Sequence, residues 1–450
     1  MLIVSGGLLI VLYIAFSLYF QDHYFYQTRI NGIDCSKATK LQAENRIRTV
    51  AGKYVLEIQG RENLSDTISA DEIDLKLDFG NQFSKIKDSQ PGYLWISALW
   101  NNSEYNLSSA VSYDVTDLDK KISSLLFFSK DNEKDPVDAK ISSYDESSDS
   151  YQIVPEDDGT KLNEEKLKSV IEDAIKNLKD TVDLESEQCY VDPSVLSDDK
   201  NLNQICDTMN KYVSADITYD WNGSKEEVNG ELISSWISPT SDNVEIDKDA
   251  VAAYVKEKAS AHDTYGRKKT FTTVTGETKV LNNGGYGWKT DKEAVTEKLI
   301  SYIEDGTVIS TEPDYSNTAA QKGEDDLGNS YVEINLSAQH VYVIINGTVV
   351  FETDCVSGDI DGNCGTPAGV FDITYKEKDA TLKGEDYESS VSYWMPFNGN
   401  IGMHDAVWRS EFGGDIYLTR GSHGCVNLPL ASAAKIFDYV NTGFPVICYY

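Results

Sequence analysis

The chain has 450 residues, of which 40% are hydrophobic and 11% aromatic, so it holds enough apolar material for several folded cores. A chain of this length predicts about three domains. The formal net charge of −34 repels phosphate backbones and argues against a nucleic-acid partner, whereas a solvated acidic surface accounts for it.

Residues 1–20 form a mostly apolar run without a charged side chain, long enough to cross a bilayer as a helix. The basic start of a cleavable signal peptide is absent, and the nearest small-residue match, Ala15-Phe16-Ser17, lies inside the run. We therefore expect a transmembrane signal anchor over 1–20 and a single-pass protein of the cell membrane, with its C-terminal part outside the cell. A helix buried in a soluble domain is the alternative. An interfacial aromatic belt would consist of Tyr19, Tyr24, Phe25 and Tyr26.

Between residues 28 and 325 helical patterns alternate with short strand-like runs. Two stretches follow one plan, in which strands lead through a turn into an amphipathic helix, so we expect two α+β domains, at 28–195 and 196–325. The helices predicted from apolar spacing and polar start signals are Lys37–Val50, Asp114–Phe128, Glu164–Leu178, Lys248–Ala259 and Lys292–Ile303.

A polar stretch at 313–328 predicts a linker, and short strands rich in β-branched residues follow it. Asn346-Gly347 between two such runs predicts a hairpin. We expect one main helix here, at Leu430–Val440. We therefore expect residues 329–450 to form a small, mostly β sandwich or barrel with its functional residues on loops.

The seven cysteines are too few for a disulfide scaffold in a chain of this length. Cys355 and Cys364 flank a turn-rich segment, and a hairpin there would bring them within bridging distance. Cys189 and Cys206 are a weaker candidate pair, and Cys425 is expected to remain a free thiol.

Cys425 lies in the stretch Ser422-His423-Gly424-Cys425-Val426-Asn427, and Gly402-Met403-His404-Asp405 precedes it in the chain. A histidine and a cysteine brought together by a fold are a candidate nucleophile pair, because imidazole can take the thiol proton near neutrality. A thiolate–imidazolium pair would lower the pKa of the thiol. The backbone N–H groups of Gly424 and Cys425 could form an oxyanion hole, and glycine leaves room for a carbonyl group.

Two other interpretations of these residues remain. Cys425 could be a buried structural thiol. His404, His423 and Cys425 could bind zinc, although no fourth ligand stands at the spacing of a structural zinc site.

Residues 329–450 are similar to the L,D-transpeptidase (YkuD-type) catalytic domain along their whole length. Many members of that family carry arginine where this chain has Asn427, which leaves the role of this position in orienting substrate open. The matching stretches, in order, are Thr366-Pro367-Ala368-Gly369, Tyr393-Trp394-Met395-Pro396-Phe397, Gly402-Met403-His404-Asp405-Ala406, Gly413-Gly414-Asp415-Ile416-Tyr417-Leu418 and Ser422-His423-Gly424-Cys425-Val426-Asn427-Leu428.

The segments Tyr151–Gly159 and Gly284–Trp288, each before a predicted helix, resemble the peptidoglycan-binding repeats that precede such catalytic domains. Peptidoglycan binding by residues 28–325 is what this resemblance implies. A stalk that sets the reach of the catalytic domain is an equal alternative.

The resemblance implies a cysteine acyltransferase that needs no metal or cofactor. Cys425 would be the nucleophile and His404 its base, while His423 and Gly424 would shape the site. Asp405 would help to fix the loop that carries the imidazole. The residues expected to bind substrate are Tyr393, Trp394, Met403, Asp405, Trp408, Ser422 and Asn427. The aromatic residues among them could instead only pack against their neighbours.

The implied reaction joins two peptidoglycan stems by a 3→3 cross-link, with release of D-Ala from a tetrapeptide donor, and carbapenems would acylate the same cysteine. With water as acceptor the protein would be an L,D-carboxypeptidase. A cell-wall-binding protein with a decayed enzyme domain is the alternative from another class, and the intact His404 and Cys425 argue against it.

Overall fold

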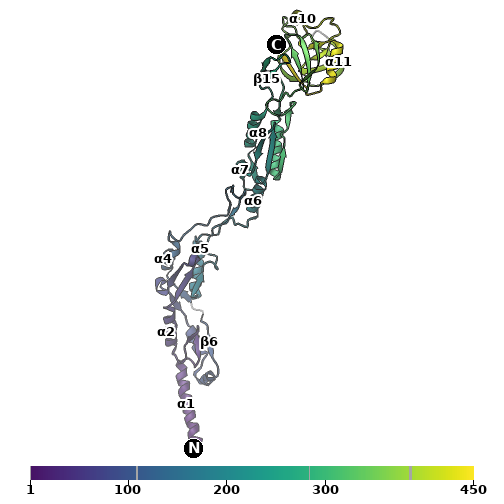
Figure 1. The fold of residues 1–450 in the computed structure, drawn as a ribbon. Helices are drawn as coiled ribbons and strands as arrows, with labels where there is room; N and C mark the ends of the chain where they lie inside the picture. Colours follow the sequence, from purple (N-terminus) through teal and green to yellow (C-terminus); the bar gives the residue numbers. More distant parts are fainter. Residues whose placement is uncertain (1, 108–109, 283, 385–387) are drawn as a thin grey trace. The chain divides into compact units, whose positions relative to one another are not determined.

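A computed structural model describes residues 2–107, 110–282, 284–384 and 388–450 (Figure 1). The chain divides into two compact units. The first consists of Met1–Lys140 and Ile153–Asp199, and the second consists of Ile141–Gln152 and Lys200–Tyr450.

The first unit combines short helices with small sheets, the largest of which have strand orders β10-β3-β4 and β2-β1-β6. Its α-helices are α1 (Leu2–Asp22), α2 (Lys40–Ala51), α3 (Gln82–Asp88), α4 (Val115–Ser123) and α5 (Glu164–Lys176), and its 3-10 helices are η1 (Arg61–Asn63), η2 (Ala70–Ile73), η3 (Gly92–Leu99) and η4 (Leu126–Phe128). Its strands are β1 (Thr28–Ile30), β2 (Ile33–Asp34), β3 (Val55–Gln59), β4 (Ser65–Ser69), β5 (Lys76–Asp78), β6 (Ser103–Tyr105), β7 (Ala110–Ser112), β9 (Ile153–Val154) and β10 (Thr181–Asp183), and β8 (Lys140–Ile141) lies at the boundary between the units.

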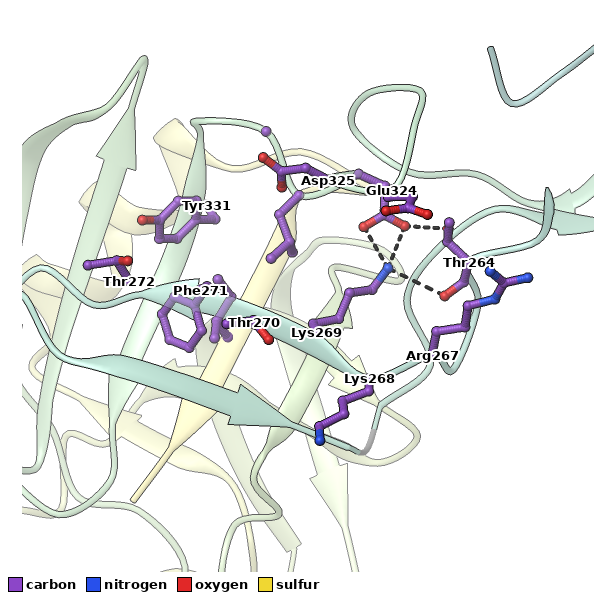
Figure 2. A pocket seen from close by; sticks show the side chains of 14 residues that line it. Thr264, Arg267, Lys268, Lys269, Thr270, Phe271, Thr272, Glu324, Asp325 and Tyr331 are labelled. Atoms are coloured by element: carbon purple, nitrogen blue, oxygen red, sulfur yellow. Dashed lines mark hydrogen bonds and ion pairs between the residues drawn. The ribbon is translucent and has the colours of Figure 1, made fainter. Parts of the chain in front are cut away.

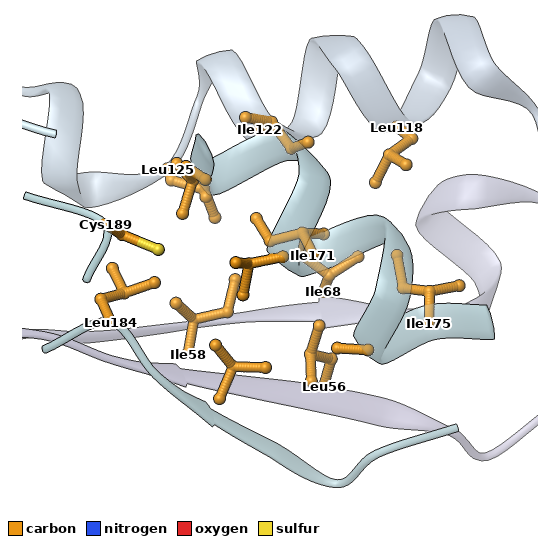
Figure 3. Close-up of a cluster of buried hydrophobic side chains, with 14 of the residues drawn as sticks. Leu56, Ile58, Ile68, Leu118, Ile122, Leu125, Ile171, Ile175, Leu184 and Cys189 are labelled. Atoms are coloured by element: carbon orange, nitrogen blue, oxygen red, sulfur yellow. The ribbon is translucent and has the colours of Figure 1, made fainter. Parts of the chain in front are cut away.

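The main core of this unit lies between α4, α5 and the sheet β10-β3-β4 (Figure 3). Asn163 caps α5 by accepting a hydrogen bond from the Lys166 backbone, 3.0 Å away. The apolar face predicted from helical spacing is buried, because Leu167, Ile171 and Ile175 all pack into the core with no exposed surface.

The sequence predicted a transmembrane anchor over residues 1–20, and from it a single-pass membrane localisation and the membrane as a partner. These predictions are wrong. Within residues 2–107, 110–282, 284–384 and 388–450, no helix combines the length and the apolar composition that crossing a bilayer requires. The end of α1 instead packs within the first unit: Phe20 is fully buried and its ring stacks 6.1 Å from that of Trp95 in η3.

The aromatic residues predicted as an interfacial belt also take part in packing. Tyr24 is fully buried and donates its hydroxyl to the Phe83 carbonyl at 2.7 Å, and Phe25 is 5% exposed. The apolar run thus leads directly into a folded core.

The second unit holds the remaining helices and strands that the structure describes. Its α-helices are α6 (Lys200–Val213), α7 (Gly230–Ser234), α8 (Lys248–His262), α9 (Lys292–Asp305), α10 (Ile416–Arg420) and α11 (Leu430–Tyr439). Its strands up to residue 317 are β11 (Asp216–Trp221), β12 (Ser224–Val228), β13 (Ile237–Pro239), β14 (Val244–Ile246), β15 (Lys269–Thr272), β16 (Thr278–Leu281), β17 (Lys289–Thr290), β18 (Val308–Thr311) and β19 (Tyr315–Asn317). The later strands are β20 (Tyr331–Asn335), β21 (His340–Ile345), β22 (Thr348–Asp354), β23 (Gly369–Asp372), β24 (Glu377–Lys383), β25 (Glu388–Asn398), β26 (Ile401–Asp405), β27 (Val426–Leu428) and β28 (Pro445–Tyr449).

From residue 331 onward two sheets and α11 share one core. The sheets have strand orders β22-β21-β20-β28-β23 and β24-β25-β26-β27. The core takes Val332 and Val446 from the first sheet, Met403 and Val426 from the second, and Ile436 from α11. The hairpin predicted at Asn346-Gly347 is confirmed, because β21 pairs with β22 around it and both residues have the positive φ of a type I′ turn.

The cysteines are all free thiols, so the disulfides suspected for Cys355–Cys364 and Cys189–Cys206 are not formed. Cys355 is fully buried in the core of the two sheets. Cys364 is partly exposed and its sulfur lies 3.4 Å from the Gly362 carbonyl within its own loop.

The glycines of the turn before α9 allow close backbone contact with the C-terminal sheets. Gly284 has φ +131°, and a Cβ added there would lie 1.8 Å from the Val370 carbonyl oxygen. Gly287 packs in the same way on Thr264. These glycines therefore serve packing, because no other residue fits so close to a neighbouring backbone.

A cavity of about 670 Å³ lies beside this contact, and Figure 2 shows Lys269 among the residues that line it. The Lys269 ammonium lies 2.6 and 2.5 Å from the two carboxylate oxygens of Asp326, and the Thr264 hydroxyl donates to the same carboxylate. Lys269 is 7% exposed and Asp326 is fully buried, so water screens this ion pair little.

Because a buried charge without its partner is costly, Asp326→Asn should lower the free energy of unfolding by about 3–5 kcal/mol. The double variant Lys269→Met/Asp326→Leu should recover most of that loss. Urea unfolding measures the free energy of unfolding of both variants, and hydrogen exchange of peptides covering 264–288 locates the change. The exposed pair Lys298–Asp314, 3.2 Å apart, is the control, and Asp314→Asn should cost less than about 1 kcal/mol. Equal losses in Asp326→Asn and Asp314→Asn would contradict this assignment.

Candidate active site

Parallel pairing of β26 with β27 brings together the two sequence stretches that carry the predicted chemistry. His404 lies opposite Asn427 in this register, and Cys425 immediately precedes β27. His404 is 4% exposed and Cys425 is 8% exposed. Both side chains line one cavity of about 220 Å³, whose other lining residues are Leu382, Ser389, Trp408, Arg409, Gly421, Ser422, His423 and Asn427.

The ring of His404 is held at both nitrogens. Its Nδ1 lies 2.8 Å from the backbone carbonyl of Asp405, and its Nε2 lies 3.0 Å from the side-chain nitrogen of Asn427. A carbonyl oxygen only accepts hydrogen bonds, so Nδ1 carries the proton. The ring centroids of Trp394 and Trp408 lie 5.8 and 6.0 Å from that of the imidazole.

The Asp405 carboxylate is directed away from the imidazole. It is 1% exposed and accepts hydrogen bonds from the backbones of Ser392 and Tyr393, both at 2.8 Å. Asp405 thus fastens β25 to the end of β26, and it positions His404 through the backbone.

The loop before Cys425 is shaped by hydroxyl groups and a glycine. Gly424 has φ +122°, a backbone conformation that other residues adopt only with strain, and a Cβ there would lie 3.3 Å from the Ile401 side chain. The Thr366 hydroxyl donates to the Gly424 carbonyl at 2.7 Å. Ser422 donates to the Cys425 carbonyl and accepts from the Gly424 N–H at 3.0 Å. The Gly424 N–H that the sequence assigned to an oxyanion hole therefore already has a partner.

Burial governs the electrostatics of the pair. It raises the pKa of the Cys425 thiol, which a hydrogen bond from the Gly402 backbone only partly offsets. Burial also lowers the pKa of His404; the Arg409 charge lowers it further, whereas the carbonyl and charge of Asp405 raise it. Both shifts oppose the thiolate–imidazolium pair expected from sequence and favour the neutral thiol and the neutral imidazole.

The other predicted substrate-binding residues lie in different surroundings. Met403 is fully buried in the core and Tyr393 packs on Phe437 with ring centroids 5.3 Å apart. Trp394 is 5% exposed beside the imidazole. Trp408 is 52% exposed and lines the cavity, as does the exposed His423.

Sequence reasoning missed Leu382 and Ser389, which bring the β24–β25 hairpin to the cavity wall, and it missed Arg409. The signal for Arg409 was its position directly after Trp408, a cation beside a predicted cavity residue. Its guanidinium donates to the Asn427 side-chain oxygen at 2.8 Å.

Comparison with known families assigns three segments of the chain to two families. Residues 329–448 match the family described as "L,D-transpeptidase catalytic domain" (YkuD). Residues 66–183 and 197–309 each match the family described as "Putative peptidoglycan binding domain". No curated protein matches the chain.

Solved structures similar to this chain include an L,D-transpeptidase from Enterococcus faecium, at 33% identity, covering 54% of this chain and 98% of that one with a TM-score of 0.44. The catalytic domain of an E. faecium L,D-transpeptidase acylated by ertapenem is 45% identical, over 27% of this chain and 98% of that one, with a TM-score of 0.26. An L,D-transpeptidase from Mycobacterium smegmatis is 24% identical over 27% of this chain and 59% of that one, with a TM-score of 0.24.

The raised pKa of Cys425 predicts slow alkylation by iodoacetamide near neutral pH in the free protein. Because only the thiolate reacts, the rate should rise with pH to a midpoint above the value of about 8.5 typical of free cysteine. Mass spectrometry of the Cys425 peptide, with a short cysteine peptide as reference, measures the profile. A midpoint below pH 7 would instead demonstrate a resting ion pair.

Proposed function

Because this chain belongs to the L,D-transpeptidases that carry a YkuD catalytic domain after peptidoglycan-binding domains, we propose that Cys425 is its acyl-transfer nucleophile and His404 the base. The family makes the chain an acyltransferase of the cell wall, with peptidoglycan as its partner. The observation that carries the proposal is the shared cavity, in which a thiol and a singly protonated imidazole both face the same space.

In the first half of the proposed reaction, the thiol of Cys425 gives its proton to His404. Its sulfur then attacks the carbonyl that joins the third residue of a tetrapeptide stem to D-Ala. The C–N bond breaks, and the amine of D-Ala leaves with the proton from His404. A thioester between the stem and Cys425 remains.

In the second half, the side-chain amine of the third residue of a neighbouring stem attacks the thioester. His404 takes the proton from this amine and returns it to the sulfur, which restores the thiol. The product is a 3→3 cross-link. Water in place of the amine would release a tripeptide stem, which is the carboxypeptidase outcome.

The neutral resting pair fits this scheme. Because the charged forms of both groups are disfavoured by burial, the nucleophile forms only when a substrate carbonyl is in place to receive it. The exposed ring of Trp408 and the hairpin residues Leu382 and Ser389 would contact the stem. We further propose that the two α+β segments, at 28–195 and 196–325, hold peptidoglycan near the catalytic domain.

Cys425→Ala should abolish both cross-linking of purified tetrapeptide and the mass increase caused by one bound carbapenem. The E. faecium catalytic domain acylated by ertapenem motivates the choice of this probe. Cys364→Ala is the matched control, because Cys364 is a partly exposed thiol outside the catalytic cavity, and this variant should retain both activities.

Mass spectrometry of the products separates the two acceptors, since transpeptidation yields a dimer and hydrolysis a tripeptide. Cross-linked product from Cys425→Ala, or a carbapenem adduct mapped to another residue, would contradict the proposed nucleophile.

A further inference from the structure

Arg409 has no role in the family motifs, yet it makes three hydrogen bonds under the catalytic cavity. Its Nε donates to the Asn427 side-chain oxygen at 2.8 Å, Nη1 to the Arg420 carbonyl at 2.9 Å, and Nη2 to the Gly421 carbonyl at 3.0 Å. Arg409 therefore joins the loop before Cys425 to the residue that contacts His404.

The donor and acceptor chemistry of this arrangement permits one orientation of the Asn427 amide. A guanidinium group only donates, so the amide oxygen of Asn427 must face Arg409. The amide nitrogen then faces His404 Nε2, and because NH2 only donates, Nε2 must offer its lone pair. Asn427 is 2% exposed, so water cannot readily replace either partner.

We propose that Arg409 is a positioning residue that acts through Asn427, fixing His404 as the neutral tautomer with Nδ1 protonated and the Nε2 lone pair directed toward the Asn427 amide. The chain Arg409–Asn427–His404 ends at the Asp405 carbonyl, which accepts from Nδ1 at 2.8 Å. Each of the two ring nitrogens thus has one allowed protonation state in the resting protein.

The same arrangement disfavours the imidazolium. When Nε2 is protonated it faces the NH2 of Asn427, donor against donor, and the amide cannot turn while Arg409 holds its oxygen. The charged or titratable groups around His404 are Arg409 and Asp405 from β26 and the loop after it, and His423 and Cys425 from the loop before β27. Arg409 thereby opposes protonation of Nε2 in the free protein.

This inference rests on the proposed function for its catalytic meaning, but its central statement concerns a protonation state that can be measured without turnover. The chain has five histidines, so selective ¹⁵N labelling of histidine in the full chain gives few signals. His404→Gln identifies the His404 signals. The wild type should show a protonated Nδ1 and an unprotonated Nε2 at neutral pH.

Arg409→Met frees Asn427 to turn its oxygen toward Nε2 and removes a nearby positive charge. Both changes stabilise the imidazolium, so the titration midpoint of His404 should move to higher pH and the second tautomer should appear. The acid limb of carbapenem acylation should move in the same direction. The maximal rate should fall about tenfold or more because the base is no longer held in place.

Arg409→Lys separates charge from geometry, because lysine restores the charge but cannot supply three donors in a fixed plane. It should leave the His404 titration closer to wild type while the maximal rate remains low. Arg267→Lys is the matched control, since Arg267 also donates to two backbone carbonyls, of Ser260 and Ala261, at 2.7 and 3.0 Å. That variant should change neither readout.

An unchanged His404 tautomer and titration midpoint in Arg409→Met would overturn the inference, whatever the acylation rate. A rate loss that only follows the fraction of folded protein, measured by circular dichroism, would likewise reduce Arg409 to a structural role. Absence of acylation in the wild type would refute the proposed function, while the tautomer measurement would still decide the role of Arg409.

Discussion

The parallel pairing of β26 with β27 is the constraint on which the candidate site depends. Residues far apart in the sequence become neighbours across this ladder, with His404 opposite Asn427 and Asp405 opposite Leu428. A shift of one residue in register would turn the imidazole from the cavity to the opposite face of the sheet. The register is held by the core residues Met403, Val426 and Leu428 and by the buried Asp405 carboxylate, which accepts a hydrogen bond from the Ser392 backbone. The same strand register therefore determines both the packing of the core and the geometry of the site.

Burial of this strand pair also sets the chemistry of the site. Burial of the thiol and of the imidazole disfavours the charged form of each, so placing both in one cavity does not by itself favour a thiolate. The geometry of the imidazole is prepared in advance by a backbone carbonyl at Nδ1 and an amide at Nε2. In the proposed reaction, the substrate carbonyl then accepts the negative charge that develops on the sulfur. A thiol that stays neutral until the substrate is bound would react slowly with other electrophiles.

Local sequence patterns predict features that depend on neighbouring residues, such as helix faces and tight turns. They do not predict contacts between residues far apart in the sequence. The apolar faces of α5 and α11 and the Asn346-Gly347 hairpin follow from spacing and turn chemistry. Helix α6 was missed although Ile205, Cys206, Met209 and Val213 are buried at helical spacing, because polar residues dominate that segment. The apolar run at 1–20 resembles an anchor, but hydropathy does not reveal that Phe20 meets Trp95. The position of Arg409 after Trp408 hinted at the cavity, but its role depends on two carbonyls and an amide that only tertiary structure brings together.

The central claim is that Cys425 carries the stem during transfer, and it can be tested by trapping that species. The full chain is mixed with a tetrapeptide donor without acceptor, quenched in acid within the first turnover and digested for tandem mass spectrometry. We expect a thioester on the Cys425 peptide, with the mass of the stem less D-Ala. Accumulation of product with no adduct at Cys425, or an adduct at a different side chain, would contradict it.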